Sequence, residues 1–300
     1  MNGVFERIAG IAGAAARENE LLSLHTTFGV GGPCDLMVWV STKQALKEVL
    51  AVARAEGLPT LVLGRGSNLL VKDGGIPGLV IRLVDEFARS EVRGTEIEAG
   101  GGASLGEVVS KATSAGICGL EFLAGIPGTV GGAARANAGA RDDWFGDRLV
   151  SLAVIDGTLA ERDLRPKHLG FGYRTSGIAP DWIVTDAVLK GRAGSVEEAR
   201  QQVEVYLERR KRTQPIGERS AGCVFRNPPG DYAGRLIDAA GLKGAAVGAA
   251  QVSSIHANFI VNAGGATARE ILELVAKIRE RVMDAHGVAL DLEIAVLGKD

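Results

Sequence analysis

Four stretches of the chain carry the signals of helices. Residues 41–56 repeat apolar side chains at the spacing of one helical face, which is made of Ala45, Leu46, Val49, Leu50 and Ala53. Residues 104–116, 195–212 and 267–287 each begin with Ser or Thr followed three residues later by Glu, the signature of a capping box. We therefore predict four helices, and the one at 195–212 ends in a basic cluster, ERRKR.

Runs of β-branched and aliphatic residues between the helices predict strands. They lie at 35–40, 58–64, 78–83, 151–157, 181–191 and 289–298. The alanine-rich stretch 8–16 predicts an ordinary helix, and without a basic leader it does not resemble a secretion signal. The pattern predicts an α+β fold in which helix 195–212 links an N-terminal region to a smaller C-terminal α/β lobe.

Length, charge and cysteine content narrow the class of protein. A chain of 300 residues predicts two or three domains. A formal net charge of −2 gives no electrostatic basis for nucleic acid or an anionic membrane as the main partner. No apolar run reaches the roughly 20 residues of a membrane span. Cys34, Cys118 and Cys223 lack metal-ligand spacing, so we expect no metal and a reduced, cytoplasmic setting.

Two loops concentrate glycine, which at 42 residues has about twice its usual share. They span 64–68 and 125–139. Neither is a dinucleotide-binding fingerprint, because Leu69 stands where a third glycine would be, and neither has the Gly-Lys-Ser/Thr of a P-loop. Both combine glycine with Ser, Thr or Asn, which is how backbone amides are presented to a phosphate. Two tight turns without a ligand are the alternative interpretation.

Eight motifs occur in an order that spans nearly the whole chain. They are TTFGVGG, LGRGSNLLV, GLEFLAGIPGTVGGAARANAGA, FGYRTS, SAGCVFRNP, AGRLIDAAGLKG, HANFIVN and LEIAVLG. Each is weak alone, but the ordered set is highly specific. With this set the chain resembles the UDP-N-acetylenolpyruvoylglucosamine reductases, the MurB family of cell-wall enzymes. Because no large insertion follows FGYRTS, it resembles the shorter subtype, which lacks an extra substrate-capping segment.

The resemblance implies a particular fold and domain order. The fold is α+β: a vanillyl-alcohol-oxidase/PCMH-type FAD-binding domain in two α+β subdomains, followed by a C-terminal α/β substrate-binding lobe. We expect the two subdomains at 1–84 and 85–194, the linking helix at 195–212 and the substrate lobe at 213–289. The last strand, 290–300, is expected to return near the first subdomain.

The resemblance also implies the cofactor and the substrates. It implies FAD, held non-covalently since neither glycine loop contains a histidine, with NADPH as electron donor. The residues implied to contact the diphosphate are Gly64, Arg65, Gly66, Ser67 and Asn68. Those implied to lie along the cofactor are Gly128, Thr129, Gly131, Asn137 and Gly139. The implied substrate is the enolpyruvyl ether of UDP-N-acetylglucosamine, which a two-step hydride transfer would reduce to UDP-N-acetylmuramic acid.

The resemblance implies catalytic roles for three residues, from their positions in the motifs. Arg174 would hold the substrate carboxylate with two parallel hydrogen bonds, a geometry that lysine does not reproduce. Glu293 would help to stabilise the enolate. Cys223 stands where the family more often has a serine that donates a proton, and a thiol with its usual pKa of about 8.5 still carries its proton at neutral pH. The implied substrate contacts are Tyr173, Arg226 and Asn227.

Each catalytic candidate also has an ordinary interpretation. Alone, Arg174 would be a surface ion-pair residue, Cys223 a small core residue and Glu293 the solvent face of a strand. His256 is expected to be a structural hydrogen bonder. Two other functions stay open at this point: another FAD oxidase of the same fold, and a non-catalytic nucleotide-sugar binding protein. A monomer is favoured for the oligomeric state.

Overall fold

The computed structural model describes residues 2–140 and 143–300, and the chain forms two compact units. The first unit combines segments 1–18, 36–64 and 79–209. The second unit combines segments 19–35, 65–78 and 210–300. Because both units are assembled from three separate segments, neither corresponds to one continuous stretch of sequence. The four-part division expected from the sequence stays a prediction.

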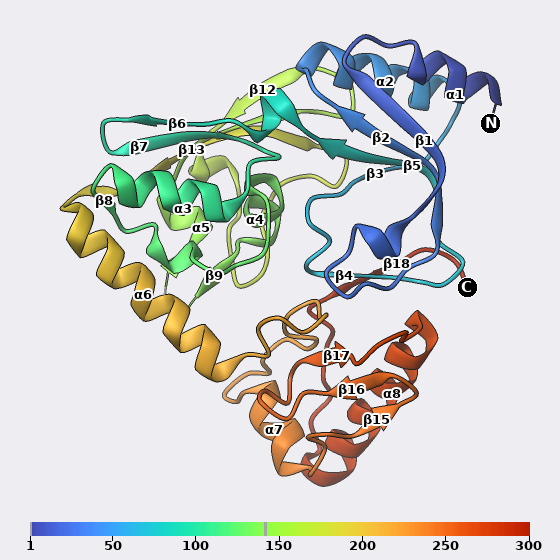
Figure 1. Cartoon of the computed structure of the whole chain (residues 1–300), viewed down its shortest axis with the longest axis vertical. Helices are drawn as coiled ribbons and strands as arrows, with labels where there is room; N and C mark the ends of the chain where they lie inside the picture. Colours follow the sequence, from blue (N-terminus) through green and yellow to red (C-terminus); the bar gives the residue numbers. More distant parts are fainter. Residues whose placement is uncertain (1, 141–142) are drawn as a thin grey trace. The chain divides into compact units, whose positions relative to one another are not determined.

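The first sheet has four strands, in the spatial order β1 (Ala14–Leu21), β2 (Pro33–Val40), β5 (Ile76–Leu83) and β3 (Thr60–Val62). β3 and β5 run parallel. Two helices, α1 (Asn2–Ala9) and α2 (Lys43–Ala55), share one apolar core with this sheet (Figure 1). The predicted face of α2 is confirmed, because Ala45, Leu46, Val49 and Ala53 are its buried residues.

The helix expected at 8–16 is wrong. Helix α1 ends at Ala9, and the alanines from Ala14 onward belong to strand β1. Gly10 and Gly13 lie between the two elements, and Gly13 has a φ of +84°, a conformation that a right-handed helix cannot contain. Pairing with β2 then outweighs the weak helical preference of a short alanine run.

The second sheet of the first unit has five antiparallel strands. Their order is β12 (Glu161–Leu164), β11 (Leu149–Ile155), β13 (Ile183–Lys190), β7 (Glu96–Gly100) and β6 (Ser90–Arg93). Three helices share its core: α3 (Leu105–Ser114), α4 (Val130–Ala136) and α5 (Phe145–Arg148). Short two-residue strands complete the unit: β8 (Ile117–Cys118) pairs with β14 (Arg192–Ala193), and β9 (Gly139–Ala140) with β10 (Asp143–Trp144). One-turn helices lie at Asp85–Ala88, Glu121–Leu123 and Pro166–His168.

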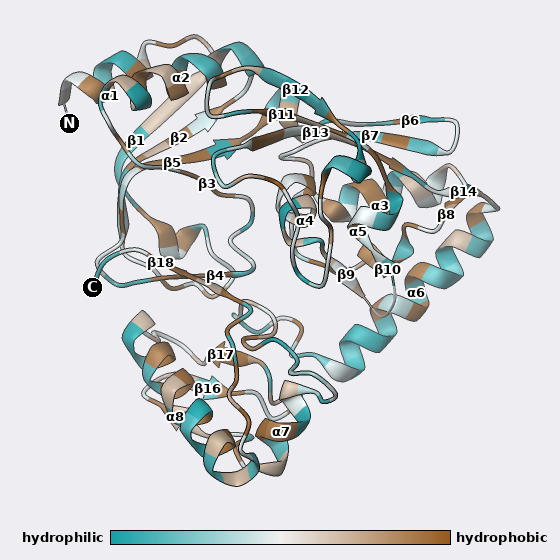
Figure 2. Cartoon of the chain, turned by 180° about the vertical axis from the view of Figure 1, so that it is seen from behind, coloured by the Kyte–Doolittle hydropathy of each residue, from teal (hydrophilic) through white to brown (hydrophobic). Residues whose placement is uncertain are grey.

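The predicted connecting helix is α6 (Val196–Thr213), and the amide of Glu198 donates to the Ser195 hydroxyl at 3.0 Å, as the sequence signature predicts. Figure 2 shows that α6 is mostly hydrophilic. Its only buried residue is Ala199. Across residues 2–140 and 143–300, the structure contains no helix with the length and apolar character needed to cross a membrane.

The second unit is built around a small antiparallel sheet and two helices. The strands are β15 (Ala246–Val247), β16 (Ala250–Val252) and β17 (Ile260–Asn262), and the helices are α7 (Ala233–Ala239) and α8 (Ala268–His286). Helix α8 buries one apolar face in this core, made of Ile271, Leu274, Val275, Ile278 and Val282. A one-turn helix lies at Leu22–Leu24, and β4 (Leu69–Val71) pairs in parallel with β18 (Ala295–Leu297).

The strand expected at 289–298 is shorter than predicted, because only 295–297 forms β18. The preceding residues pair with a different part of the chain. Leu292 forms a bridge with Phe225, and the Glu293 amide donates to the Val224 carbonyl at 2.8 Å. The tail therefore lies beside residues 224–226 before it turns to pair with β4.

Helix α8 is capped by residues from two places in the sequence. Thr267 and Glu270 form the predicted reciprocal capping box, and Gly287 ends the helix with a φ of +66°. The carboxylate of Asp73 adds two further acceptors, which receive the amides of Ala268 at 2.8 Å and Arg269 at 3.0 Å. A negative group at this end is also favoured by the helix dipole.

We predict that Asp73→Ala lowers the free energy of unfolding by about 1 kcal/mol, because two amides at the start of α8 lose their acceptor. Thermal or urea unfolding measures the change. Asp284→Ala, in the last turn of the same helix, is the matched control, since removing a negative charge there is neutral or slightly stabilising. Equal stability of Asp73→Ala and the wild type would show that the capping box alone holds this end.

Candidate active site

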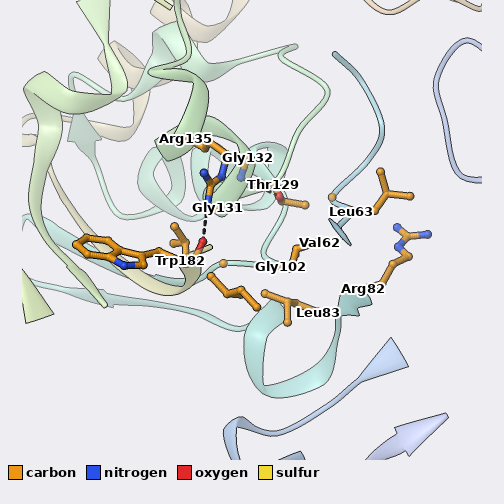
Figure 3. Close-up of a pocket in the computed structure, with 14 residues that line it drawn as sticks. Val62, Leu63, Arg82, Leu83, Gly102, Thr129, Gly131, Gly132, Arg135 and Trp182 are labelled. Atoms are coloured by element: carbon orange, nitrogen blue, oxygen red, sulfur yellow. Dashed lines mark hydrogen bonds between the residues drawn. The ribbon is translucent and has the colours of Figure 1, made fainter. Parts of the chain in front are cut away.

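The first unit contains a pocket lined by apolar and basic side chains and by glycine backbone. It holds about 600 Å³ of space, including its open mouth (Figure 3). Its lining residues are Val62, Leu63, Gly64, Arg82, Leu83, Gly101, Gly102, Thr129, Gly131, Gly132, Arg135, Trp182, Ile183 and Val184. Apolar side chains and glycine backbone therefore make up much of the lining, as is common in ligand and cofactor pockets.

Three consecutive glycines, residues 100–102, were missed in the sequence analysis, and Gly101 and Gly102 line this pocket. A Cβ atom on any of them would lie under 3.0 Å from a neighbouring carbonyl oxygen, closer than real Cβ atoms come. The oxygens belong to Phe87, Val184 and Leu83, respectively. Only glycine allows these backbones to approach so closely. The run AGGGAS is the signal that could have identified the site.

The two predicted glycine loops contribute adjacent residues to the pocket. A Cβ on Gly64, at the start of the first loop, would lie 2.7 Å from the Thr129 hydroxyl oxygen of the second loop. Gly131 also lines the pocket, and its amide donates to the Gly101 carbonyl at 2.8 Å. Gly128 lies just before Thr129, and its carbonyl accepts from the Leu105 amide at 3.1 Å. The structure therefore brings Gly64, Thr129 and Gly131 together.

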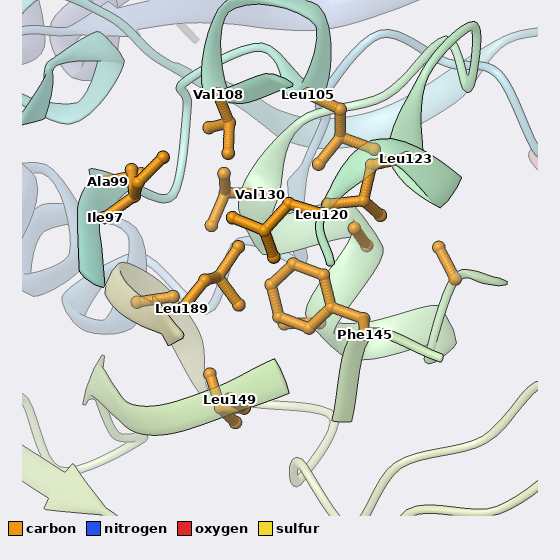
Figure 4. Packing of buried hydrophobic residues seen from close by; sticks show 14 of the residues in the cluster. Ile97, Ala99, Leu105, Val108, Leu120, Leu123, Val130, Phe145, Leu149 and Leu189 are labelled. Carbon is orange, nitrogen blue, oxygen red and sulfur yellow. The ribbon is translucent and has the colours of Figure 1, made fainter. Parts of the chain in front are cut away.

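The second glycine loop contains a helix that the sequence analysis did not predict. Thr129 caps α4 by accepting the Gly132 amide at 3.3 Å, and Asn137 ends it with a φ of +42°. Val130 packs into the unit's core, in the same buried cluster as Leu105 and Phe145 (Figure 4). Tertiary packing of this kind stabilises a helix that its two glycines disfavour.

Most of the first loop belongs to the second unit. Gly66 has a φ of +60°, and a Cβ there would lie 2.5 Å from the His25 carbonyl oxygen. Arg65 and Asn68 are exposed, whereas Ser67 is half-buried. The Asn68 side-chain amide donates to the Glu293 carbonyl at 3.2 Å, and its own carbonyl accepts from Ala295. Asn68 thus connects the loop directly to the backbone of Glu293.

Arg174 lies in a strained tight turn of the first unit. Gly172 and Thr175 exchange two backbone hydrogen bonds around it, at 3.1 and 3.2 Å. The φ of Arg174 is +54°, a left-handed conformation that is uncommon outside glycine and clusters at functional sites. Its guanidinium carbon lies 5.8 Å from the ring centre of Trp144, which makes an edge contact with Tyr173 at 5.7 Å.

Gly139 packs against the indole ring of Trp144. It pairs with Trp144 between β9 and β10, and a Cβ on Gly139 would lie 2.5 Å from the indole ring. Gly139 was expected to lie along the cofactor. In the structure its close neighbour is Trp144, a residue that the sequence analysis did not select.

Cys223 and Glu293 lie on neighbouring extended segments of the second unit. Cys223 forms a bridge with Phe259 and is half-buried, unlike the fully buried Cys34 and Cys118. The Glu293 amide donates to the Val224 carbonyl, one residue beyond Cys223. The segments that carry Cys223 and Glu293 are therefore adjacent through their backbones.

Asn258 holds the Cys223 segment in place and was not selected from the sequence. Its side chain accepts the Phe225 amide at 2.9 Å and donates to the Phe225 carbonyl at 2.8 Å. Its own carbonyl accepts the Val224 amide at 2.8 Å. A buried asparagine within an apolar run such as HANFIV is the signal that could have identified it.

Two further residues selected from the sequence, Arg226 and Asn227, follow Phe225 in this segment. The Asn227 side chain accepts the Ala233 amide at 3.1 Å, at the start of α7, whereas the Arg226 side chain is exposed. His256 acts as the expected structural hydrogen bonder, because its Nδ1 accepts the Asn258 amide at 3.2 Å. Burial lowers the pKa of His256, with a smaller effect from Lys243 in the same direction.

Comparison with known proteins identifies first the class and then the family. A model of the FAD binding domain matches residues 34–158, so the fold is that of a vanillyl-alcohol-oxidase/PCMH-type flavoprotein. A second model, for the C-terminal domain of UDP-N-acetylenolpyruvoylglucosamine reductase, matches residues 214–297.

Similar whole proteins agree with both models. UDP-N-acetylenolpyruvoylglucosamine reductase 2 of Symbiobacterium thermophilum is 44% identical over 94% of this chain and 92% of its own. The enzyme of Desulforamulus reducens is 43% identical, with 94% and 93% covered. The crystal structure of the Thermus caldophilus reductase has 44% identity and a TM-score of 0.84, covering 95% of this chain and 100% of that one. The chain belongs to the UDP-N-acetylenolpyruvoylglucosamine reductase family.

The residues of the pocket fit the FAD that this family implies. Apolar residues from β3, β5 and β13 and the glycine backbones of 101–102 and 131–132 suit a flat ring. The amides of Gly101, Gly102 and Gly131 already donate to carbonyls of the chain. Because these amides are already paired, this part of the pocket suits the ring of FAD and not its phosphates. Phosphate binding would need other residues.

We predict that Gly66→Ala abolishes FAD retention and lowers stability by more than about 1 kcal/mol, because alanine is strained at positive φ and its Cβ meets the backbone of residues 25–26. The ratio of flavin to protein absorbance and thermal unfolding measure the two effects. Gly106→Ala, at a helical glycine with open space around it, is the control: it should leave FAD content unchanged and stability unchanged or slightly higher. Full FAD content in Gly66→Ala would show that the loop tolerates the change and does not shape the cofactor site.

Proposed function

We propose that the protein catalyses the FAD-dependent reduction of UDP-N-acetylenolpyruvoylglucosamine by NADPH, giving UDP-N-acetylmuramic acid for peptidoglycan precursor synthesis. The proposal rests on one observation above all. A chain that matches the reductases over 94% of its length keeps an arginine, a protic side chain and a carboxylate in the motifs FGYRTS, SAGCVFRNP and LEIAVLG. A non-catalytic binding protein has no need for this set.

FAD, bound by the first unit, would supply hydride transfer from NADPH to the terminal carbon of the substrate's enolpyruvyl group. The protein then has to manage the charge that results. Hydride addition places two electrons in the substrate, and negative charge develops on the adjacent carbon and spreads into the carboxylate. A fixed cation near this carboxylate lowers the barrier, because it stabilises the charge only as it forms.

Arg174 supplies this cation. Its planar guanidinium suits two parallel hydrogen bonds to a carboxylate. The strained turn and the neighbouring Trp144 limit the orientations of the side chain, so little freedom is lost when the substrate binds. Tyr173, which is 45% exposed in the same turn, contacts the substrate in this proposal.

Cys223 supplies the proton that completes the reaction. The thiol donates its proton to the carbanion carbon, and the resulting thiolate is later reprotonated from solvent. Glu293 helps to hold the enolate as a hydrogen-bond donor in its protonated form. The arrangement of Asn258 and Glu293 around residues 223–225 keeps the thiol's backbone fixed during this step.

The remaining selected residues have supporting roles in the proposal. Gly64, Arg65, Gly66, Ser67 and Asn68 contact the FAD diphosphate, and Arg226 contacts the UDP part of the substrate. A cytoplasmic location is supported by the three cysteines, none of which forms a disulfide.

We predict that Arg174→Lys keeps FAD bound and is reduced by NADPH at a nearly normal rate, whereas reoxidation by the enolpyruvyl substrate slows by roughly 100-fold. A point charge does not reproduce the bidentate contact with the developing enolate. Stopped-flow absorbance of the flavin separates the two half-reactions. Arg200→Lys, on the exposed face of α6, should behave as wild type. An unchanged reoxidation rate in Arg174→Lys would remove this residue from the site.

We predict a similar separation for Cys223. Cys223→Ala should be reduced by NADPH normally but reoxidised about 10²–10⁴ times more slowly, the usual effect of a positioned general acid. Cys223→Ser should recover much of the rate, because a hydroxyl donates the same proton. Wild-type reoxidation in Cys223→Ala would mean that the proton comes from elsewhere.

Alkylation gives a second test of Cys223. A thiol reagent should inactivate the native wild type and spare Cys223→Ser. The other two cysteines are internal controls, because both are fully buried and burial raises the pKa of Cys34 to about 11, which keeps it protonated.

A further inference from the structure

Helix α4 connects the pocket to the segment that carries Arg174. Its first residues, Thr129, Gly131 and Gly132, line the pocket. Its other end is attached to residues 172–182 through several hydrogen bonds. The Arg135 guanidinium donates to the carbonyls of Ala179, at 3.3 Å, and of Trp182, and the Arg135 carbonyl accepts from the Ser176 hydroxyl at 2.8 Å.

Asn137, directly after α4, makes the attachment nearest to Arg174. Its side chain is 4% exposed. The amide nitrogen donates to the Gly172 carbonyl at 2.9 Å, and the side-chain oxygen accepts the Gly146 amide at 2.9 Å. The Asn137 side chain thus links the carbonyl that closes the Arg174 turn to the helix α5.

The Arg174 turn needs support of this kind. The Gly172 carbonyl already accepts the Thr175 amide, which closes the turn, and Asn137 is its second donor. A left-handed arginine costs free energy, and such a conformation persists only where surrounding contacts hold it. The flanking Gly172 adds no side chain that could do so.

We propose that Asn137 is a positioning residue: it holds the Tyr173–Arg174 turn in the conformation that presents the guanidinium to the substrate carboxylate. The inference rests on the role proposed above for Arg174. Both ends of the Asn137 side chain are bonded to the chain itself, and the expected contact of Asn137 with FAD stays a prediction.

Two substitutions separate the contacts of Asn137. Both Asp and Gly tolerate its left-handed backbone. Asn137→Asp keeps the oxygen that accepts from Gly146 but loses the donor to Gly172. Asn137→Gly loses both contacts and adds no charge, so an effect shared by the two variants comes from the lost donor and not from a new carboxylate.

The experiment measures four quantities on the FAD-loaded enzyme. They are flavin content, the rate of reduction by NADPH, the rate of reoxidation by the enolpyruvyl substrate, and the calorimetric Kd of that substrate for the oxidised enzyme. We expect normal flavin content and normal reduction in both variants. Reoxidation should slow and the substrate Kd should rise, each by roughly 10-fold, as for one lost hydrogen bond that orders a binding group.

A double variant tests whether Asn137 acts through Arg174. In an Arg174→Lys background, Asn137→Gly should slow reoxidation by less than about 2-fold more, since coupled residues are not additive. Thr42→Ala, which removes the cap of α2 elsewhere in the unit, controls for general destabilisation and should leave reoxidation unchanged.

The outcomes distinguish the inference from the function on which it depends. Loss of flavin from Asn137→Asp, fully additive effects in the double variant, or wild-type reoxidation in both single variants would each overturn the positioning role. If Arg174→Lys itself reoxidises normally, the proposed role of Arg174 fails instead. If Thr42→Ala slows reoxidation as much as Asn137→Gly, the effect is general destabilisation, and the inference also falls.

Discussion

The first unit depends on a close contact between backbones, in which residues 100–102 lie directly against the main chain of other segments. Carbonyl oxygens of Phe87, Val184 and Leu83 occupy the space that side chains would need there. The amides of these glycines are paired as well, with Arg89, Thr185 and Phe87, so the approach is stabilised by hydrogen bonds and not only permitted by the missing Cβ. Strand β13, the end of β5 and the start of α4 meet around this point. The pocket is the space that remains between them.

Local signals in the sequence predicted much of the fold. Helices α2, α6 and α8 were predicted nearly to the residue, because caps and apolar periodicity act over a few neighbouring positions. The helix expected at 8–16 was wrong and α4 was not predicted, since in both cases distant partners decide the structure. The division into units could not be predicted either, because segments such as 19–35 and 65–78 join residues beyond 209 only through long-range pairing.

The candidate site followed the same rule. The motifs selected the residues for which we propose chemical roles, such as Arg174 and Cys223, by type and position. They did not select the residues that hold them. Asn258 contacts a segment 33 residues away, and Trp144 becomes a neighbour of Arg174 only after the chain has folded back. In the sequence, such supporting residues look like any other asparagine, glycine or aromatic residue. Only their contacts in the folded chain show that they have a role.

In the glycine loops, the absence of a Cβ atom serves both the packing of the chain and the proposed cofactor site. Gly66 is glycine because its backbone is left-handed and lies against residues 25–26, and Gly131 is glycine beside the backbone of Gly101. Both explanations concern the chain's own packing and need no ligand. The same close packing leaves the glycine part of the pocket wall without side chains, and a flat cofactor can lie close to such a surface. A substitution that fills one of these contacts therefore damages fold and cofactor site together, which is why loss of FAD alone does not identify a residue that touches it. A chemical role is better assigned where loss of activity occurs without loss of stability, as we predict for substitutions of Arg174 and Cys223.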